Sequence, residues 1–253
     1  MSASAPSFAA APLGPRLYPL GETAVVLEFG TGINEATNAA IQAVAAQLAA
    51  HPFPGFVELV PAFATLTVFY DPWQVSQTAS GSPFDYVARQ LRQQLGQAPA
   101  PGPEPTTTGP AVEIPVCYGG EFGPDLAAVA RHCGLSPEEV VARHAGADYQ
   151  VHFIGFAPGF PYLGGLPAEL AMPRRASPRA AVPAGAVGIA GAQTGIYSLP
   201  TPGGWQLIGR TPERLFRPEA VEPSRLRAGQ RLRFVSITAE QFRHWPAFSA
   251  TAR

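Results

Sequence analysis

The residues best suited to chemistry are arginines. The chain contains 17 arginines and no lysine, so every positively charged side chain other than a protonated histidine is a guanidinium group. Arg174, Arg175 and Arg179 lie in the stretch PRRASPR, and Arg210 lies in LIGRT. A proline-containing loop can direct planar guanidinium groups at a carboxylate or a phosphate with paired hydrogen bonds. The pattern therefore predicts an anion site, with a solvated basic loop or an intersubunit salt-bridge patch as the alternative.

A second candidate is the glycine-rich stretch VPAGAVGIAGAQTGIY and the turn PGGW that follows it. Successive glycines bring backbone N–H groups close together, so they can surround an anion or a substrate carbonyl. The glycines predicted to do this are Gly188, Gly191, Gly203 and Gly204. Gln193 and Tyr197 supply an amide and a hydroxyl group for a small polar substrate. The alternative is that these residues only form turns and cap loops.

Aromatic side chains and one histidine complete the candidates. The aromatic residues are Phe156, Phe160, Tyr162 and Trp205, which indicate a pocket wall or a partner interface, with core packing as the alternative. His144 is predicted at the end of a helix, where the helix dipole favours an imidazolium. It is a candidate general acid or base, although a lone histidine is more often structural.

Several classes of function are excluded by what the sequence lacks. It has no GxSxG, HExxH or Walker motif and no Cys or His cluster with metal-ligand spacing, so no metal site is expected. The absence of lysine excludes a Schiff base and a lysine-linked biotin in this chain. No apolar run is long enough for a membrane helix and no signal peptide is recognisable, which indicates a cytoplasmic protein.

Charge is distributed unevenly along the chain. Residues 1–150 hold 5 Arg against 13 acidic residues, and residues 151–253 hold 12 Arg against 5 acidic residues. Without a basic run, this asymmetry indicates an anionic ligand or an acidic partner surface rather than nucleic acid.

Around these candidates the sequence predicts an α+β fold of two domains. The first, residues 1–96, has strands at 23–29, 57–60 and 65–70 and helices at 33–48 and 82–95. This order of strand, helix, two strands and helix predicts a small ferredoxin-like α/β sandwich. Residues 97–110, QAPAPGPEPTTTGP, predict an extended linker.

The second domain, residues 111–253, is predicted to begin with a strand at 112–116. Two helices follow at 124–133 and 136–144, the second with a capping box at Ser136. Further strands are predicted at 149–153, 205–208 and 231–237, and a short helix at 238–245. Residues 153–211 are predicted to form rigid loops, because they contain too much glycine and proline for a long helix. Short strands separated by loops indicate a closed barrel.

The motifs FIGFAPGFPYLGGLP, PRRASPR, VPAGAVGIAGAQTGIY, PGGWQLIGRTP and LFRPE resemble those of the family of 5-oxoprolinase B subunits. The wider family is named for allophanate hydrolase subunit 1 and includes Kip-type inhibitors (KipI) of a sensor histidine kinase. The resemblance implies that the second domain is a cyclophilin-like barrel. It also implies homologous A and C subunits as partners, with which the chain forms a hetero-oligomer.

What the resemblance implies about activity is an ATP-dependent hydrolase that opens 5-oxo-L-proline to L-glutamate, at an intersubunit site with ATP and Mg²⁺. The lactam carbonyl would be activated by phosphorylation, and this chain would be inactive alone. Under this hypothesis the catalytic residues are His144, Arg175 and Arg210. The residues predicted to bind substrate or phosphate are Arg174, Arg179, Gly188, Gly191, Gln193, Tyr197, Gly203 and Gly204. The alternatives are a non-catalytic inhibitor of a histidine kinase and half of a biotin-dependent carboxyltransferase of the urea carboxylase type.

Overall fold

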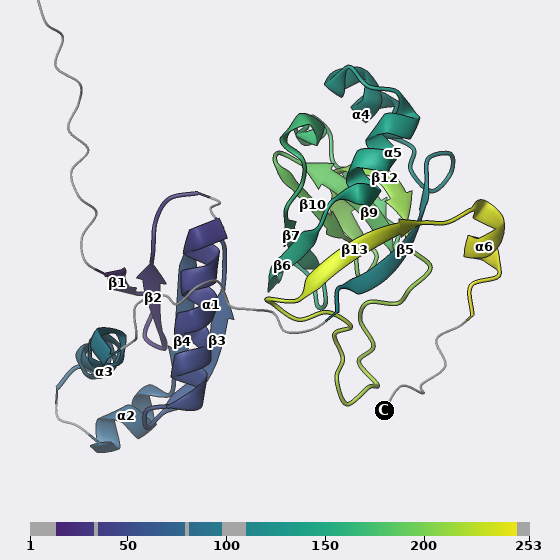
Figure 1. The fold of residues 1–253 in the computed structure, drawn as a ribbon. Coiled ribbons are helices and arrows are strands. Elements are labelled where there is room, and N and C mark those ends of the chain that lie inside the picture. Colours follow the sequence, from purple (N-terminus) through teal and green to yellow (C-terminus); the bar gives the residue numbers. More distant parts are fainter. Residues whose placement is uncertain (1–13, 33–34, 79–80, 98–109, 247–253) are drawn as a thin grey trace, which may run out of the picture. The chain divides into compact units, whose positions relative to one another are not determined.

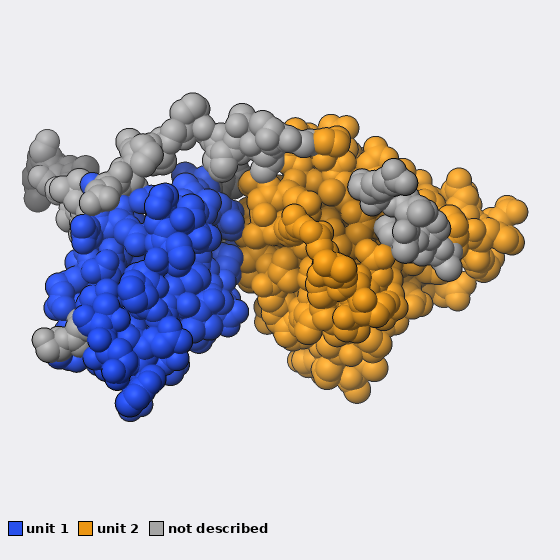
Figure 2. All heavy atoms as spheres, turned by 90° about the horizontal axis from the view of Figure 1, so that it is seen from below, with its two compact units in different colours: residues 1–105 blue, residues 106–253 orange. Residues whose placement is uncertain are grey.

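The structure is a computed structural model that describes residues 14–32, 35–78, 81–97 and 110–246. The chain divides into two compact units, residues 1–105 and 106–253, which Figure 2 shows in different colours. Each unit has its own hydrophobic core. The linker predicted at residues 97–110 lies, except at its two ends, outside the described residues. None of the described helices is long and apolar enough to cross a lipid bilayer.

The first unit is a four-stranded antiparallel sheet in the order β1-β2-β4-β3, with helices packed against it (Figure 1). Its elements are β1 (Arg16–Pro19), β2 (Ala24–Glu28), α1 (Glu35–Ala50), β3 (Phe56–Pro61), β4 (Thr65–Tyr70), α2 (Pro72–Thr78) and α3 (Pro83–Gln97). The predicted order of strand, helix, two strands and helix is confirmed by β2, α1, β3, β4 and α3.

The sequence prediction lacks two elements of this unit, β1 and α2. β1 pairs with β2, with Arg16 opposite Glu28 and Pro19 opposite Val25. A βαββαβ sandwich takes its last strand from after the second helix. Here the sheet position beside β2 is filled instead by a strand that precedes β2. The strand is short and ends in proline, which is why RLYP has a weak strand signal.

Alternating side chains of β4 lie at the centre of the first core. Leu66, Val68 and Tyr70 are buried, while the residues between them are only half-buried. The helices add buried side chains to the same cluster: Ile41, Leu48, Val87 and Leu91. Side chains that recur about every 3.6 residues in the helices and every two residues in the strand therefore pack together in one core.

The second unit contains a closed barrel of seven strands in the order β10-β7-β6-β13-β5-β12-β9, which confirms the predicted barrel. β13 and β5 are parallel, and the other neighbouring pairs are antiparallel. β8 and β11 form a separate two-stranded sheet. The elements are β5 (Val112–Tyr118), α4 (Leu126–Cys133), α5 (Pro137–Gly146), β6 (Tyr149–Ile154), β7 (Pro161–Gly164), the 3₁₀ helix η1 (Ala168–Leu170), β8 (Arg179–Val182), β9 (Ala186–Ala190), β10 (Gln193–Ile196), β11 (Thr201–Gly203), β12 (Gln206–Arg210), β13 (Arg231–Ser236) and α6 (Ala239–Arg243).

The prediction that residues 153–211 form loops is wrong over much of their length, because β7 to β12 lie within them. Gly188 in β9 lies opposite Gly195 in β10, and a β-carbon on Gly188 would lie 3.1 Å from Cβ of Trp205. The glycines allow short strands to pass close to bulky side chains. Their abundance therefore reflects close packing of strands.

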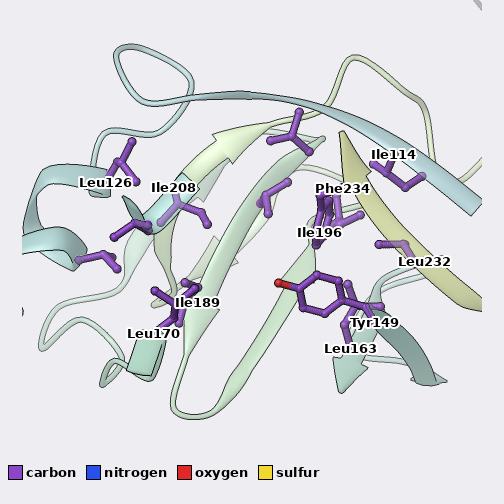
Figure 3. Close-up of a cluster of buried hydrophobic side chains, with 14 of the residues drawn as sticks. Ile114, Leu126, Tyr149, Leu163, Leu170, Ile189, Ile196, Ile208, Leu232 and Phe234 are labelled. Atoms are coloured by element: carbon purple, nitrogen blue, oxygen red, sulfur yellow. The ribbon is translucent and has the colours of Figure 1, made fainter. Parts of the chain in front are cut away.

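Side chains from several strands point into the barrel and form its core (Figure 3). The buried residues that Figure 3 labels are Ile114, Leu126, Tyr149, Leu163, Leu170, Ile189, Ile196, Ile208, Leu232 and Phe234.

Helix α5 packs against β13, and its predicted capping box between Ser136 and Glu139 is confirmed. Helix α4 ends at Gly134, which has φ 67° and donates hydrogen bonds to the last carbonyls.

Candidate functional site

A pocket of about 180 Å³ opens on the second unit. Its lining residues are Phe156, Phe160, Tyr162, Arg174, Tyr197, Pro202, Gly203, Gly204 and Trp205. All of them except Pro202 are candidates from the sequence. The structure therefore brings one predicted arginine, two predicted glycines and five predicted aromatic residues to a single place.

Five segments position these residues. The loop after β6 carries Phe156 and Phe160, and β7 carries Tyr162. The segment before β8 carries Arg174. Tyr197 directly follows β10. Pro202 and Gly203 lie in β11, and Gly204 and Trp205 connect β11 to β12. Because β7, β10 and β12 belong to the barrel, the pocket is built on a rigid support.

Phe160 lies at the centre of the aromatic wall. Its ring makes edge-on contacts with Tyr197 at 5.3 Å and with Trp205 at 5.5 Å between ring centroids. Phe156 contacts the Phe160 ring at 5.4 Å but is 63% exposed. Phe160, Tyr197 and Trp205 are all buried in one hydrophobic cluster. Three rings of the aromatic wall are therefore held by packing, whereas the Phe156 ring is exposed to solvent.

Phe156 also has an unusual backbone. Its φ is 66°, and it is the single non-glycine residue with positive φ among those that the structure describes. The Ala157 N–H donates to the Gly155 carbonyl at 2.7 Å, which closes a tight turn around Phe156. A left-handed conformation is costly for a side chain of this size. The turn thus presents the ring at the mouth of the pocket at a cost to stability.

The polar groups of the pocket are one guanidinium and two phenols. Arg174 is exposed, and no carboxylate among the described residues forms an ion pair with it. Burial raises the pKa of Tyr162 and of Tyr197, and the nearby positive charge of Arg174 opposes both shifts. Both tyrosines are therefore neutral near pH 7. The pocket combines an available cation with neutral hydroxyl groups and an apolar wall.

Arg175 and Arg179 are held by Asp125 and do not line the pocket. Arg175 Nη1 donates to Asp125 Oδ1 at 3.1 Å, and Arg179 Nη2 donates to the same oxygen at 2.8 Å. Asp125 is buried, and its one negative charge offsets part of the two positive charges within the protein. The geometry favours a structural role for both arginines over the predicted contact with an anion.

Arg210 also lies outside the set of pocket residues. Its Nε donates to the Ala184 carbonyl at 2.9 Å, and its guanidinium carbon lies 6.0 Å from the centre of the Phe242 ring. These contacts tie the end of β12 to the residues before β9 and to α6. The structure does not bring Arg210 together with Arg174.

His144 lies in the barrel core and has no exposed surface. Its ring stacks on Phe234 at 4.6 Å between centroids. Tyr118 Oη lies 2.9 Å from His144 Nδ1, and Thr194 Oγ1 lies 3.0 Å from Nε2. Burial lowers the pKa of His144 to about 3, so the ring is neutral near pH 7. This environment favours a structural histidine over the predicted general acid or base.

Gly188, Gly191 and Gln193 are not among the residues that line the pocket. Gly191 lies in the turn between β9 and β10, and its N–H donates to the Met172 carbonyl at 2.7 Å. Gly188 lies within β9. Gln193 is buried at the start of β10, and its Nε2 has no hydrogen-bond partner in the described part of the chain. These positions explain both glycines as parts of the barrel.

Asp125 is the residue that sequence reasoning missed. In the sequence it stands at the start of a helix, which is an ordinary place for aspartate. Its one other signal is the excess of arginine over acidic residues after residue 150, since such a surplus needs compensation from earlier in the chain. Within the described residues, no group of three or more His, Cys, Asp or Glu is arranged to hold a metal ion.

The comparisons with known proteins agree with the motifs. The family described as carboxyltransferase domain, subdomain C and D, matches residues 15–226. A relative from Bacillus subtilis (strain 168), named as the B subunit of 5-oxoprolinase, is 49% identical over 226 residues, which are 88% of this chain and 93% of the relative. This chain belongs to the family of 5-oxoprolinase B subunits. The resemblance seen in the motifs is thereby confirmed.

Solved structures extend the family likeness to the fold. The protein TTHA0988 is 39% identical to this chain with a TM-score of 0.71, over 85% of this chain and 40% of TTHA0988. The chain thus spans less than half the length of that protein. Kluyveromyces lactis urea carboxylase is 17% identical with a TM-score of 0.68, over 92% of this chain and 23% of its own. At that identity the likeness is one of fold alone.

Proposed function

We propose that this chain is a subunit of an ATP-dependent 5-oxoprolinase and that the aromatic pocket binds 5-oxo-L-proline. The single observation that carries this proposal is Arg174, an exposed guanidinium without an ion pair among the described residues, at the edge of an apolar pocket. The name of the family supports hydrolysis of 5-oxoproline as the reaction, and the chemistry of the pocket supports it as the substrate site. We also propose that the barrel is cyclophilin-like, in keeping with its closed seven-stranded form.

The substrate and the pocket are chemically matched. 5-Oxoproline is a small five-membered lactam with one carboxylate, one amide and two apolar ring carbons. Arg174 would bind the carboxylate with two hydrogen bonds, and the rings of Phe160 and Trp205 would contact the apolar ring atoms. The volume of about 180 Å³ is below the range of about 300–1,000 Å³ for sites of drug-sized ligands. A small metabolite is the appropriate size.

Tyr197 and Gly203 would complete the contacts with the amide. The Tyr197 hydroxyl is neutral and lies beside Gly203 at the pocket, so it is able to donate a hydrogen bond to a lactam oxygen. Gly203 and Gly204 also line the pocket, so their backbone groups would lie near the bound substrate. In this arrangement the chain's own residues bind and orient the substrate.

ATP with Mg²⁺ is proposed to bind at a site that is shared with a partner subunit. Sites for transferable phosphates combine metal ligands with several cations or N–H groups. The pocket has one cation, Arg174, and the described residues hold no group of three or more potential metal-ligating side chains. The described residues at the pocket therefore do not by themselves form a complete site for ATP with Mg²⁺. When bound, ATP would supply the free energy for opening a stable amide.

Partner subunits follow from the same hypothesis. We propose that the chain acts in the cytoplasm in a hetero-oligomer with homologues of the A and C subunits, and that it has no 5-oxoprolinase activity alone. The exposed ring of Phe156 and the open side of the pocket are consistent with an active site that a second subunit completes.

A carboxyltransferase is the second candidate function, because the matched family is described as a carboxyltransferase domain. Arg174 would then hold an anionic acceptor, and the carboxyl group would come from carboxybiotin on another protein. An assay of carboxyl transfer from carboxybiotin separates this candidate from the oxoprolinase. Inhibition of a sensor histidine kinase, the remaining alternative, is tested by measuring autophosphorylation of the kinase with the chain added.

The proposal is tested first by omission. The chain is co-expressed with homologues of the A and C subunits, and ATP-dependent release of glutamate from 5-oxoproline is measured with each subunit left out in turn. We expect activity only when all subunits are present. An intact, folded complex that releases no glutamate, or one that is equally active without this chain, contradicts the proposal.

The second test asks whether Arg174 binds the substrate. A hydrogen-bonded charge pair is worth about 1.5–3 kcal/mol, so Arg174→Ala should lower kcat/KM about 10- to 150-fold, mainly through KM. Arg214→Ala is the matched control, because Arg214 is also exposed but pairs with Glu219 at 2.7 Å and does not line the pocket. Wild-type kcat/KM in the Arg174→Ala complex would show that this pocket is not the substrate site.

A further inference from the structure

We infer that Asp125 is a positioning residue that holds Arg174 in place at the pocket. Asp125 is 6% exposed and is not among the residues that line the pocket, so any effect on ligand binding must pass through others. The effect on substrate rests on the proposed function, whereas the effect on the loop that carries Arg174 does not.

The carboxylate of Asp125 joins three segments of the second unit. Oδ1 accepts hydrogen bonds from the guanidinium groups of Arg175 and Arg179, at 3.1 Å and 2.8 Å. Oδ2 accepts from the Leu207 N–H at 2.7 Å, and the Asp125 N–H donates to the Leu207 carbonyl at 2.9 Å. The start of α4, the loop before β8 and strand β12 are thereby connected through one side chain.

The orientation of Asp125 is not explained by helix capping. Asp125 occupies the N-cap position of α4, but its side chain makes no cap hydrogen bond. Aspartate at this position usually accepts a hydrogen bond from an N–H of the first turn. Here both oxygens are directed at the arginines and at β12. The carboxylate thus stabilises the loop.

The connection reaches Arg174 through the residues on both sides of it. The Arg175 N–H donates to the Gly204 carbonyl at 2.7 Å, and Gln206 Nε2 donates to the Pro173 carbonyl at 3.0 Å. Gly204 itself lines the pocket. With its neighbours bound to the pocket wall, the Arg174 backbone has little freedom to move. The Arg174 side chain forms no ion pair among the described residues, so it remains available at the pocket.

Charge explains why the carboxylate is required. Arg175 and Arg179 bind the same oxygen, so their guanidinium groups lie close together. Without a negative charge between them they would repel, in a partly buried site where screening by solvent is weak. The loop would then leave its position, and Arg174 would move with it.

The test compares Asp125→Asn with Asp148→Asn in the assembled complex. Asp148 is the matched control, because it also pairs with two arginines, Arg233 at 2.7 Å and Arg231 at 3.6 Å, but is half exposed and does not line the pocket. Hydrogen exchange of residues 173–179 reports the position of the loop. KM for 5-oxoproline, measured with and without Arg174→Ala, reports its effect on binding.

We expect Asp125→Asn to speed exchange of residues 173–179 and to raise KM about tenfold or more, with a smaller change in kcat. In the Arg174→Ala background it should raise KM no further, because Asp125 acts through Arg174. Asp148→Asn should change neither readout. If Asp125→Asn does not fold, the double variant Arg175→Gln/Arg179→Gln breaks the same ion pairs without leaving two like charges together. The lost connection to Asp125 is then expected to give the same two effects at smaller size, and unchanged exchange of the loop in this variant overturns the positioning role.

The outcomes are distinguishable. Unchanged exchange of the loop overturns the positioning role. Faster exchange with unchanged KM overturns the inference that Asp125 affects substrate binding through Arg174. A further rise of KM when Asp125→Asn is added to Arg174→Ala overturns it as well. A wild-type complex without activity contradicts the proposed function instead, and loop exchange still decides whether Asp125 positions the loop.

Discussion

The hydroxyl group of Tyr197 occupies the space that a β-carbon on Gly203 would take. The two atoms would lie closer than 3.0 Å, a separation that real β-carbons essentially never show. Tyr197 is 1% exposed and packs against Phe160 and Trp205, so neighbouring rings hold its own ring in place. The absence of a side chain at residue 203 therefore decides where a pocket tyrosine can lie.

Gly203→Ala should consequently lower the free energy of unfolding by about 1–3 kcal/mol, the usual cost of excess volume in a packed site. The measurement is denaturant unfolding of the purified chain. Gly204→Ala is the matched control for stability, because a β-carbon there would meet nothing closer than 3.7 Å. Equal stability of the two variants would contradict the crowding between Tyr197 and Gly203.

Phe156 offers a test of backbone strain at the mouth of the pocket. Its φ of 66° is easily adopted by glycine and costs other residues about 1–2 kcal/mol. Phe156→Ala removes the ring and keeps the strain, whereas Phe156→Gly removes both. We expect Phe156→Gly to be more stable than Phe156→Ala by about 1 kcal/mol in denaturant unfolding. The opposite order would mean that the turn is not strained.

His144 makes stability depend on pH. Its pKa is about 3 in the folded chain because of burial, against 6.5 when unperturbed, so below about pH 6.5 the unfolded chain binds a proton that the folded chain does not. The free energy of unfolding should therefore fall as pH falls from about 6 towards 3. The contribution of this residue is up to about 1.4 kcal/mol per pH unit.

The check is the pH dependence of unfolding in the wild type and in His144→Gln, which cannot titrate. Over this range the free energy of unfolding of the wild type should fall by up to about 1.4 kcal/mol per pH unit more than that of His144→Gln. An NMR titration provides a direct control, since the His144 resonance should not shift between pH 5 and pH 8. A His144 resonance that titrates near pH 6.5 would contradict its burial as a neutral ring.

Much of the fold follows from local sequence. The alternation in TLTVFY predicts β4, and the helical stripe around Ile41 and Leu48 predicts α1. Ser136 and Glu139 form the predicted capping box, and Gly134 follows the predicted helix end at residue 133. These features depend on residues within one or two turns of each other, which is why sequence patterns reveal them.

The segment 205–208 is predicted as a strand and overlaps β12, but the other strands between residues 153 and 211 could not be predicted in the same way. Gly188 and Gly195 have little strand propensity, and they lie in strands because those strands cross close to Trp205 and Phe160. Closure of the barrel provides this environment. Local propensity was therefore overruled by contacts that exist only in the folded unit.

The candidate site divides along the same line. The sequence alone determined that arginines, glycines and aromatic residues concentrate in one segment, and that several of them suit a small anion. Only the tertiary structure decided which arginine is available. Arg174 and Arg175 are adjacent and chemically identical, but Arg175 binds Asp125, 50 residues earlier in the chain, while Arg174 lines the pocket. Pairing of a buried carboxylate depends on distance in space, which local sequence does not encode.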